Sequence, residues 1–306
     1  MQKRTIGALG ALAAAVMLLP ASVAGQDGPL TTPWGDPDLQ GTWSYASLTP
    51  LQRPTSMSDK EFFTPEEAAQ RNYAVTLDQP DTPGSVGSYN ALWFDRGEVS
   101  SDMRTSLIVD PADGRLPVTA ETQRRQTELR EYARAHPADS WVDRTNWDRC
   151  ITYHGVPPIS TGYNNSVQIL QTPTHVAIRM ENIHDVRIIP LDGRPQLDDK
   201  IRQWNGDSRA HWDGDTLVIE TANYSDQTVH RFPSSRQTKA VERFRRVAED
   251  RIETEFTIED ATVYTAPWTA VRPMPRLDDY IIYEYACHEG NYAMSNILMS
   301  ERSAER

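Results

Sequence analysis

The sequence predicts a mainly β protein, an antiparallel lipocalin-like barrel or strongly curved sheet with an irregular, partly helical N-terminal third. From residue 166 onward, apolar and polar residues alternate in successive runs, as they do in half-buried strands. Turn signals such as Asp213-Gly214 separate the runs, which is typical of hairpins. About six to eight strands at this spacing predict a barrel that can hold one small ligand.

The first 25 residues have the pattern of a secretory signal peptide. Lys3 and Arg4 precede an apolar run over residues 6–19, and the small residues Ser22 and Ala24 follow it. This run is shorter than the roughly 20 residues that a membrane helix needs. No later stretch is long and apolar enough to be such a helix. We therefore expect an exported chain, periplasmic or secreted, with no membrane span.

The charge and the cysteine content of the chain limit its partners and indicate a disulfide. The formal charge is −12 over 306 residues, and acidic residues are spread along the whole chain. A nucleic-acid partner is not expected, because no basic patch is present to neutralise phosphates. Cys150 and Cys287 are an even count in an exported chain, which favours a disulfide over metal-bound thiolates or one reactive thiol. The composition does not indicate an oligomeric state.

Residues 26–150 are expected to form the irregular and helical region, packed on a barrel domain of residues 151–306. A helix should begin after Thr64, because Thr64 can cap it, Pro65 suits its first position and Glu67 can complete a capping box. The elements expected in this region are, in order, a strand at 39–47, this helix, a strand at 106–110 with a turn at 111–114, and a helix at 119–135 that ends before Pro137.

The barrel domain should consist of hairpins. Asp213-Gly214 and residues 248–250 are the two clearest turns between runs. The strands expected here are residues 166–172, 175–181, 183–191, 209–212, 216–221, 241–247, 251–260 and 280–289.

Four segments carry a resemblance to known proteins. YNNSVQILQTP, HDVRIIPLDGRP, IRQWNGDSRAHWDGDTLVIET and YEYACHEGNY resemble segments of a large family of exported bacterial proteins with no established common activity. The resemblance covers most of the chain, from DPDLQGTW to NILM. It implies that the motif residues cluster on the strands and turns described above, and it implies no particular reaction.

The HDVR segment contains the first candidate catalytic residues. On an extended strand, Asp185 and Arg187 face one way and His184 faces the other. His184 could act as a general base and Arg187 as a clamp for developing negative charge. The alternative is a solvent-facing Asp185–Arg187 ion pair of little energetic consequence.

The segment WNGDSRAHWDGD resembles the wall of a binding pocket. Charged Asp207 and Arg209 lie between Trp204 and Trp212, and indole rings can hold a ring or a sugar while polar groups orient it. The alternative is a hairpin in which Trp212 caps the core and Asp207 organises a turn.

Further candidates for ligand contact lie near the expected mouth of the barrel. Tyr163, Asn164 and Asn165 could hydrogen-bond a ligand there, or could form only a turn. Tyr264 and Trp268 could be lid aromatics, although a hydrophobic flap that seals one end of the barrel explains them equally simply.

The segment YEYACHEGNY brings a cysteine, a histidine and a glutamate together. Alternation would place Tyr285, Cys287 and Glu289 on one face of a strand and His288 on the other. If Cys287 is bonded to Cys150, the strand is pinned where His288 and Glu289 project, and Tyr285 could contact substrate. No metal site is predicted, because no H-E-x-x-H or paired C-x-x-C spacing is present.

Together these residues favour a cofactor-free acid–base enzyme, a lyase, hydratase or isomerase, that acts on a small, apolar and ring-containing molecule. The sequence has no G-x-S-x-G elbow, phosphate loop or dinucleotide fingerprint. In this hypothesis His184 or His288 moves the proton, Arg187 and Arg209 stabilise negative charge, and Asp207 or Glu289 orients a partner. The alternatives are a non-enzymatic lipocalin-like binding protein and a metal-dependent hydrolase.

Overall fold

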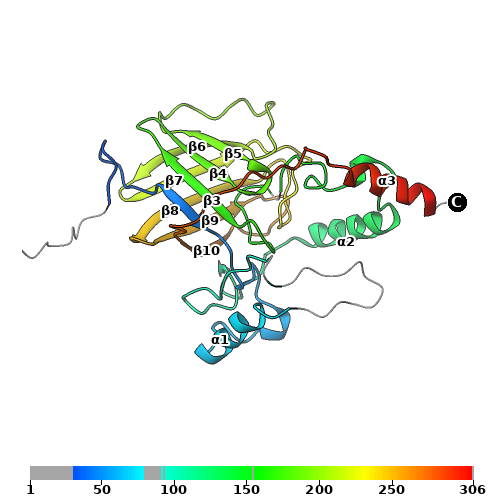
Figure 1. Ribbon diagram of the computed structural model, residues 1–306, viewed down its shortest axis with the longest axis horizontal. Coiled ribbons are helices and arrows are strands. Elements are labelled where there is room, and N and C mark those ends of the chain that lie inside the picture. The colour runs from blue at the N-terminus through cyan, green and yellow to red at the C-terminus, as the bar shows by residue number, and fades with distance from the viewer. Residues whose placement is uncertain (1–29, 79–90, 92–93, 154, 305–306) are drawn as a thin grey trace, which may run out of the picture.

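The structure is a computed structural model that describes residues 30–78, 91, 94–153 and 155–304. The predicted signal peptide lies outside these residues. Within them, ten strands form two antiparallel sheets, and helices lie at the periphery (Figure 1). The prediction of a mainly β, antiparallel protein is therefore confirmed.

The smaller sheet has four strands in the order β1-β3-β4-β5. They are β1 (Gly41–Ser44), β3 (Ser166–Gln171), β4 (His175–Met180) and β5 (Val186–Pro190). The alternation of the sequence appears directly as burial, since Val176, Ile178 and Met180 of β4 are buried and the residues between them are not. The first strand comes from the N-terminal region, so that region takes part in the sheet.

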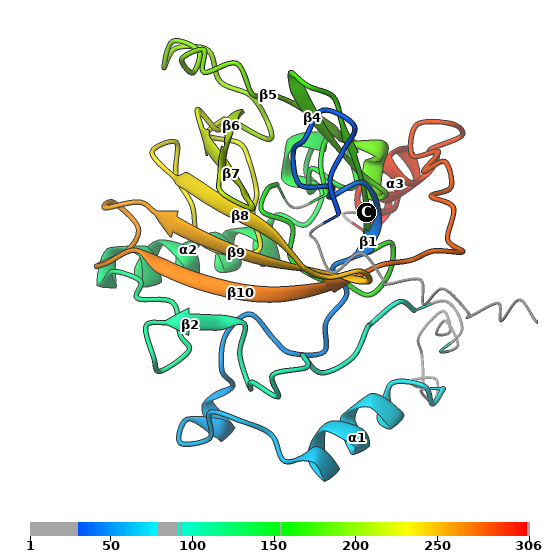
Figure 2. The ribbon, with the colours of Figure 1, turned by 90° about the vertical axis from the view of Figure 1, so that its left-hand side faces the viewer.

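The larger sheet has six strands in the order β2-β10-β9-β8-β7-β6 (Figure 2). They are β2 (Ile108–Asp110), β6 (Asp207–Asp213), β7 (Thr216–Ala222), β8 (Lys239–Ala248), β9 (Arg251–Glu259) and β10 (Trp268–Pro275). The predicted hairpin joins β6 to β7, and Gly214 has a φ of +62°, which glycine adopts without strain.

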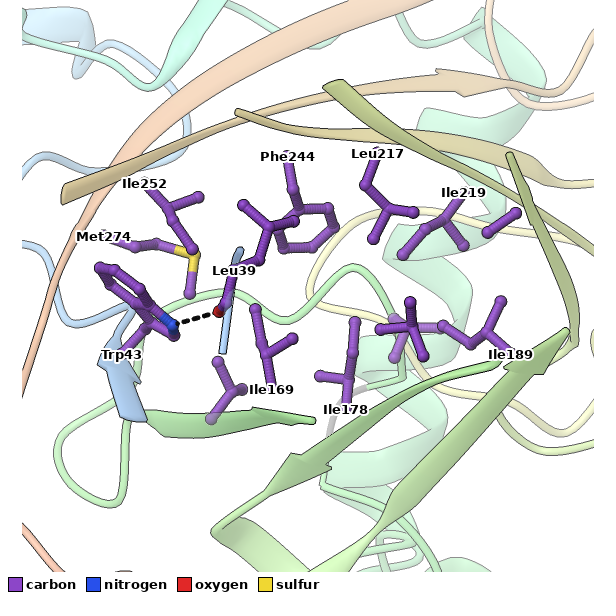
Figure 3. Packing of buried hydrophobic residues seen from close by; sticks show 14 of the residues in the cluster. Leu39, Trp43, Ile169, Ile178, Ile189, Leu217, Ile219, Phe244, Ile252 and Met274 are labelled. Atoms are coloured by element: carbon purple, nitrogen blue, oxygen red, sulfur yellow. Dashed lines mark hydrogen bonds between the residues drawn. The ribbon is translucent and has the colours of Figure 1, made fainter. Parts of the chain in front are cut away.

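The main hydrophobic core lies between the two sheets (Figure 3). Ile169, Ile178 and Ile189 of the smaller sheet face Leu217 and Phe244 of the larger one. At one end of this core the indole Nε1 of Trp43 donates to the carbonyl of Leu39 at 2.9 Å, so its buried polar atom is satisfied. Packed side chains therefore fill this part of the space between the sheets.

The two sheets approach each other at two edges. At the β1–β10 edge the backbone joins them, because Trp43 bridges to Arg276 and the Leu277 amide donates to the Thr42 carbonyl at 2.8 Å. At the β5–β6 edge the described residues form no backbone ladder, and contact is made by side chains such as Arg187, whose Nη2 donates to Ser208 Oγ at 3.1 Å. We call this second edge the open seam. A closed barrel is not formed by the described strands.

The backbone register explains what faces the open seam. The amide of Met180 donates to the carbonyl of Asp185 at 2.8 Å, which sets the alternation of hydrogen bonds between β4 and β5. In that alternation the backbone groups of Val186, Ile188 and Pro190 point away from β4 and into the seam. Proline fits such an edge position because it has no N–H to pair.

The helices agree with the prediction where capping signals are strong. For α1 (Pro65–Ala74), Thr64 Oγ1 accepts from the Glu67 amide at 3.3 Å and the Glu67 carboxylate accepts from the Thr64 amide at 2.8 Å, so the predicted capping box is present. Helix α2 (Ala120–Ala135) is capped by Thr119 as expected. Helix α3 (Ala293–Ala304) was not expected. No helix among the described residues is of a length and hydrophobicity that could cross a membrane.

The C-terminal strand prediction is wrong. Residues 280–289 lie in an irregular segment, and the position beside β9 is taken by β10. Pro273 lies within β10, and proline is normally excluded from a central strand, but β2 pairs only near Thr269 and Ala270, so no described strand pairs with β10 on that side at Pro273.

Candidate functional site

A pocket of about 410 Å³ lies at the open seam. Its walls are Val186, Arg187 and Ile188 of β5 and residues 202–208, which lead into β6. We call it the seam pocket. Because neither strand pairs with the other here, the two edges leave room for a small molecule beside their backbone groups. Arg187, Trp204 and Asp207, three of the predicted site residues, lie in its walls.

Arg187 is held in place by a buried network beneath the pocket. Its guanidinium donates to Glu242 Oε2 at 2.6 Å and Oε1 at 3.2 Å, and to Ser208 Oγ and Thr221 Oγ1 at 3.1 Å each. The side chains of Arg187 and Glu242 are only 5% and 1% exposed. The Asp185–Arg187 ion pair, the alternative offered by the sequence, is therefore replaced by a bidentate pair with a residue of β8.

Asp185 does not itself line the pocket, but it directly precedes Val186 of the pocket wall. Burial raises the pKa of its carboxyl to about 6, and a hydrogen bond from the Asn205 side chain and the nearby His184 lower it in part. Asn205 lies in the pocket wall, so the carboxyl adjoins the cavity. A carboxyl that titrates near neutral pH can take up and return a proton.

Buried polar atoms without a partner gather around this pocket. Four of the buried atoms that lack a hydrogen-bond partner among the described residues lie here, namely Asp185 Oδ2, Arg187 Nε, Arg202 Nε and Asn205 Oδ1, and others such as Arg272 Nε lie elsewhere. Such atoms are rare in native proteins, and each is costly to bury. Donors and acceptors in one small volume are the arrangement that a polar ligand group would satisfy.

The pocket also has an apolar side. Val186 and Ile188 point outward from β5 and are 52% and 64% exposed, although both are aliphatic. The indole of Trp204 is half-buried in the opposite wall. A flat or aliphatic ring could lie against these three side chains while its polar substituent meets the inner wall.

Asp207 and Arg209 are engaged within the protein. Asp207 Oδ1 accepts from Arg209 Nη1 at 2.6 Å, and Oδ2 accepts from the Leu197 amide at 2.7 Å. Arg209 also donates to the carbonyls of Pro195 and Ser208. These bonds fix the loop that carries Trp204, so the two charged residues shape the wall of the pocket.

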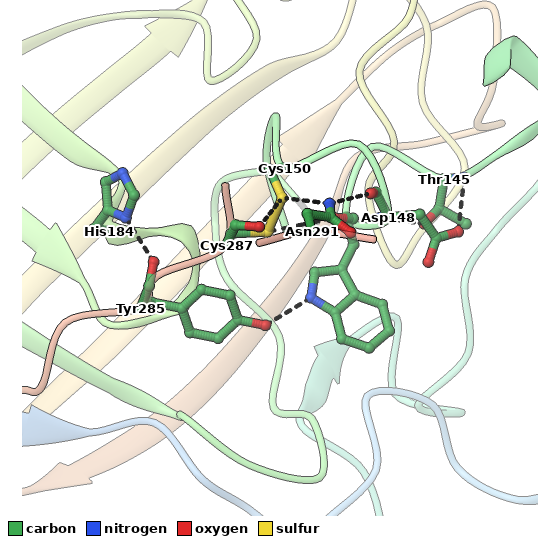
Figure 4. The surroundings of a disulfide bond; sticks show 8 residues. Thr145, Asp148, Cys150, His184, Tyr285, Cys287 and Asn291 are labelled. Atoms are coloured by element: carbon green, nitrogen blue, oxygen red, sulfur yellow. Dashed lines mark hydrogen bonds between the residues drawn. A yellow bond between two sulfur atoms is a disulfide. The ribbon is translucent and has the colours of Figure 1, made fainter. Parts of the chain in front are cut away.

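His184 lies outside the strand in which it was expected, in a turn (Asn182–His184) with a φ of +49°. Its Nδ1 lies 3.0 Å from the carbonyl of Tyr285 (Figure 4). Since a carbonyl only accepts, Nδ1 carries the proton and Nε2 has the free lone pair in the neutral ring. His184 is exposed and directly precedes Asp185.

The predicted disulfide is present. Cys150 and Cys287 are bonded, with their Cα atoms 5.7 Å apart (Figure 4). Tyr285 accepts a hydrogen bond from the indole of Trp147 at 2.8 Å, so the same segment is tied down twice. His288 and Glu289 are exposed in the loop that follows, and neither lines the seam pocket.

The YNNS residues form a tight turn. The Asn165 side chain is buried, accepts from the Thr161 amide at 2.7 Å and donates to the carbonyls of Asp95 and Thr161. Asn164 has a φ of +55°, and its carbonyl accepts from the side chain of Asn182. Tyr163 is half-buried beside them. The bonds of Asn165 are used to hold the turn.

The remaining aromatic candidates belong to the core. Tyr264 and Trp268 are buried in a second hydrophobic cluster, where their ring centroids are 6.0 Å apart. The hydroxyl of Tyr264 donates to the carbonyl of Pro233. Trp212 packs against the main core. These positions match the alternative in which the aromatics seal and cap the core.

Sequence reasoning missed four residues of the site, Asp185 as a proton carrier, Arg202, Asn205 and Glu242. Asp185 and Asn205 adjoin predicted site residues in the sequence and lie within the motifs described above. The motifs therefore pointed to the correct positions. Glu242 had none, because an inward-facing glutamate on β8 breaks the alternation expected for a core strand. The described residues contain no group of three or more His, Cys, Asp or Glu that could hold a metal.

Comparisons with known proteins add little. No protein-family model and no curated protein matches the chain. Solved structures of the fluorescent protein UnaG, a mutant and the wild type, align with TM-scores of 0.25 and 0.24 and identities of 12% and 13%. Each alignment covers 37% of this chain and 72% of the other. A similarity of this size does not establish a shared fold.

Proposed function

We propose that the chain is an exported, cofactor-free acid–base enzyme that acts in the seam pocket on a small ring-containing molecule. In this proposal the two sheets are an open, lipocalin-like barrel whose unpaired edge is the binding site. The observation that carries the proposal is the carboxyl of Asp185, with a pKa near 6, beside a pocket that contains unpartnered guanidinium nitrogen. A base next to an oxyanion clamp is what proton abstraction beside a carbonyl requires.

In the proposed reaction, the named residues and the substrate account for the proton and the electron pair at each step. The Asp185 carboxylate takes a proton from a carbon next to the substrate carbonyl, and the electron pair moves onto the carbonyl oxygen as an enolate. Arg187 faces that charge from the inner wall. Return of the proton to another carbon gives an isomerisation, and loss of a group from the next carbon gives an elimination. His184, through its basic Nε2, can exchange the proton with solvent.

Deuterium exchange tests this proposal without the natural substrate. The protein is incubated in D₂O with cyclohexanone and 2-indanone, and loss of the α-proton signals is followed by NMR. We expect exchange above the buffer rate that rises with pH through an apparent pKa near 6, because the ionised carboxyl is the base. Asp185→Asn should lose it, and Asp192→Asn, an exposed carboxylate paired with Arg194, should keep it.

The same experiment separates the rival function. A non-enzymatic binding protein would bind the ketones, seen as line broadening, and leave their exchange rate at the buffer value. Exchange that persists in Asp185→Asn would contradict the role of this carboxyl.

A further inference from the structure

We infer that the seam pocket recognises a ring-containing monocarboxylate, and that Arg202 is the residue that selects its carboxylate. The inference rests on the proposed function of the same pocket and specifies the class of substrate. The charged side chains in the wall of the seam pocket are the basis of this inference. Arg187 is neutralised by Glu242, and Asp207 by Arg209.

Arg202 is the charge of the wall that stays unbalanced. In the part of the chain that the structure describes, no carboxylate lies within 4.0 Å of its guanidinium. One side of the fork is anchored, since Nη1 donates to the carbonyl of Arg236 at 2.8 Å. Its Nε is buried and has no partner. Nη2 has no hydrogen-bond partner among the described residues, so it can donate to a carboxylate oxygen in the pocket.

The charge needed to balance Arg202 indicates the charge of the ligand. One uncompensated guanidinium matches a single negative charge, whereas a phosphate dianion would bring one charge too many into a partly desolvated site. Arg187 lies in the same wall, but its charge is already balanced by Glu242.

The apolar side of the pocket requires a hydrophobic body on the same molecule. Trp204, Val186 and Ile188 offer one aromatic face and two exposed aliphatic side chains. A volume of about 410 Å³ accommodates one or two fused rings. The carboxylate at Arg202 would then hold the ring in a fixed orientation relative to Asp185.

Benzoate and benzamide are a matched pair of probes, because they share shape and differ in charge. We expect calorimetric titration of the wild type to show benzoate binding at least about tenfold more tightly than benzamide. Arg202→Gln should abolish that preference while benzamide binding stays unchanged. Arg202→Lys should retain part of it, since the charge remains but the planar fork is lost. Arg245→Gln, which removes an exposed charge from β8, should retain all of it.

Three results would overturn the inference: equal affinities for the two probes in the wild type, no binding of either probe, or an undiminished preference in Arg202→Gln. A fold check by amide NMR accompanies each variant. Failure here is distinct from failure of the proposed reaction. Exchange of the neutral ketones without a carboxylate preference would contradict only the inferred class of substrate. A carboxylate preference without any exchange would contradict only the proposed catalysis.

Discussion

At the scale of single residues, Asp185 is the group whose environment most changes its chemistry. The sequence placed it beside Arg187, where a carboxylate would be ionised and unremarkable in its titration. In the structure Arg187 turns inward to Glu242, and Asp185 is left partly buried with only an amide partner and His184 nearby. Its pKa therefore moves toward neutrality. Alternation only placed Asp185 and Arg187 on one face of a strand, and the partner of Arg187 across the core depends on how the two sheets meet, which local sequence does not encode.

The raised pKa of Asp185 has a measurable cost in stability. Because the folded state holds this proton more tightly than the unfolded state, the folded state loses relative stability as the pH rises through about 4 to 6. We expect Asp185→Asn to increase the free energy of unfolding by about 1–2 kcal/mol at pH 8, and by little at pH 4. Urea denaturation at the two pH values measures it.

Asp192→Asn is the control for that experiment. The pKa of Asp192 is lowered to about 2 by Arg194, so its removal should not stabilise the protein at pH 8. An equal gain for Asp185→Asn at both pH values would show that the effect is not the titration of this carboxyl.

At the scale of elements, prediction succeeded where a local signal was sufficient. The capping box at Thr64 and the Asp213-Gly214 turn each act within a few residues, and both are present. Prediction failed where contacts with strands that are distant in the sequence decide the structure. Pro273 is tolerated in β10 because nothing pairs with that side of the strand at this residue, and residues 280–289 join neither sheet although their sequence alternates like a strand.

The capping box gives a prediction for α1. Thr64→Ala removes the acceptor of the Glu67 amide, which should destabilise the helix by about 1 kcal/mol. Only Ala68 of this helix is buried, so the loss should remain local. Hydrogen exchange followed by mass spectrometry should show about fivefold faster exchange in residues 65–74 and no change in the strands. Thr76→Ala, just beyond the helix, is the control, and a uniform increase across the protein would contradict local opening.

At the scale of the whole molecule, the disulfide connects parts that the sheets leave loosely joined. Cys287 lies in the irregular segment after β10, and Cys150 lies in the region before β3. Compartment and cysteine count were enough to predict this bond, because pairing of two cysteines requires no knowledge of the fold. What they did not reveal was that the bond holds a segment outside the sheets.

Loss of the disulfide should destabilise the protein as a whole. The bridge closes a loop across 137 residues, and its removal by Cys150→Ser with Cys287→Ser should lower the free energy of unfolding by about 2–4 kcal/mol. Chemical denaturation with and without dithiothreitol measures it. Reduced wild type should match the double variant, which should itself not respond to the reductant. An unchanged midpoint for reduced wild type would refute the expectation.

The two N-terminal strands impose an order on assembly during synthesis. β1 pairs with β3, and Ile108 of β2 pairs with Ala270 of β10, so each early strand has a partner that is made much later. Until the ribosome has passed Pro275, Leu107 and Ile108 have no sheet to cover them. The nascent chain must therefore carry β2 as an unpaired, apolar strand while about half of its residues are made, and such a segment needs protection from aggregation until β10 arrives.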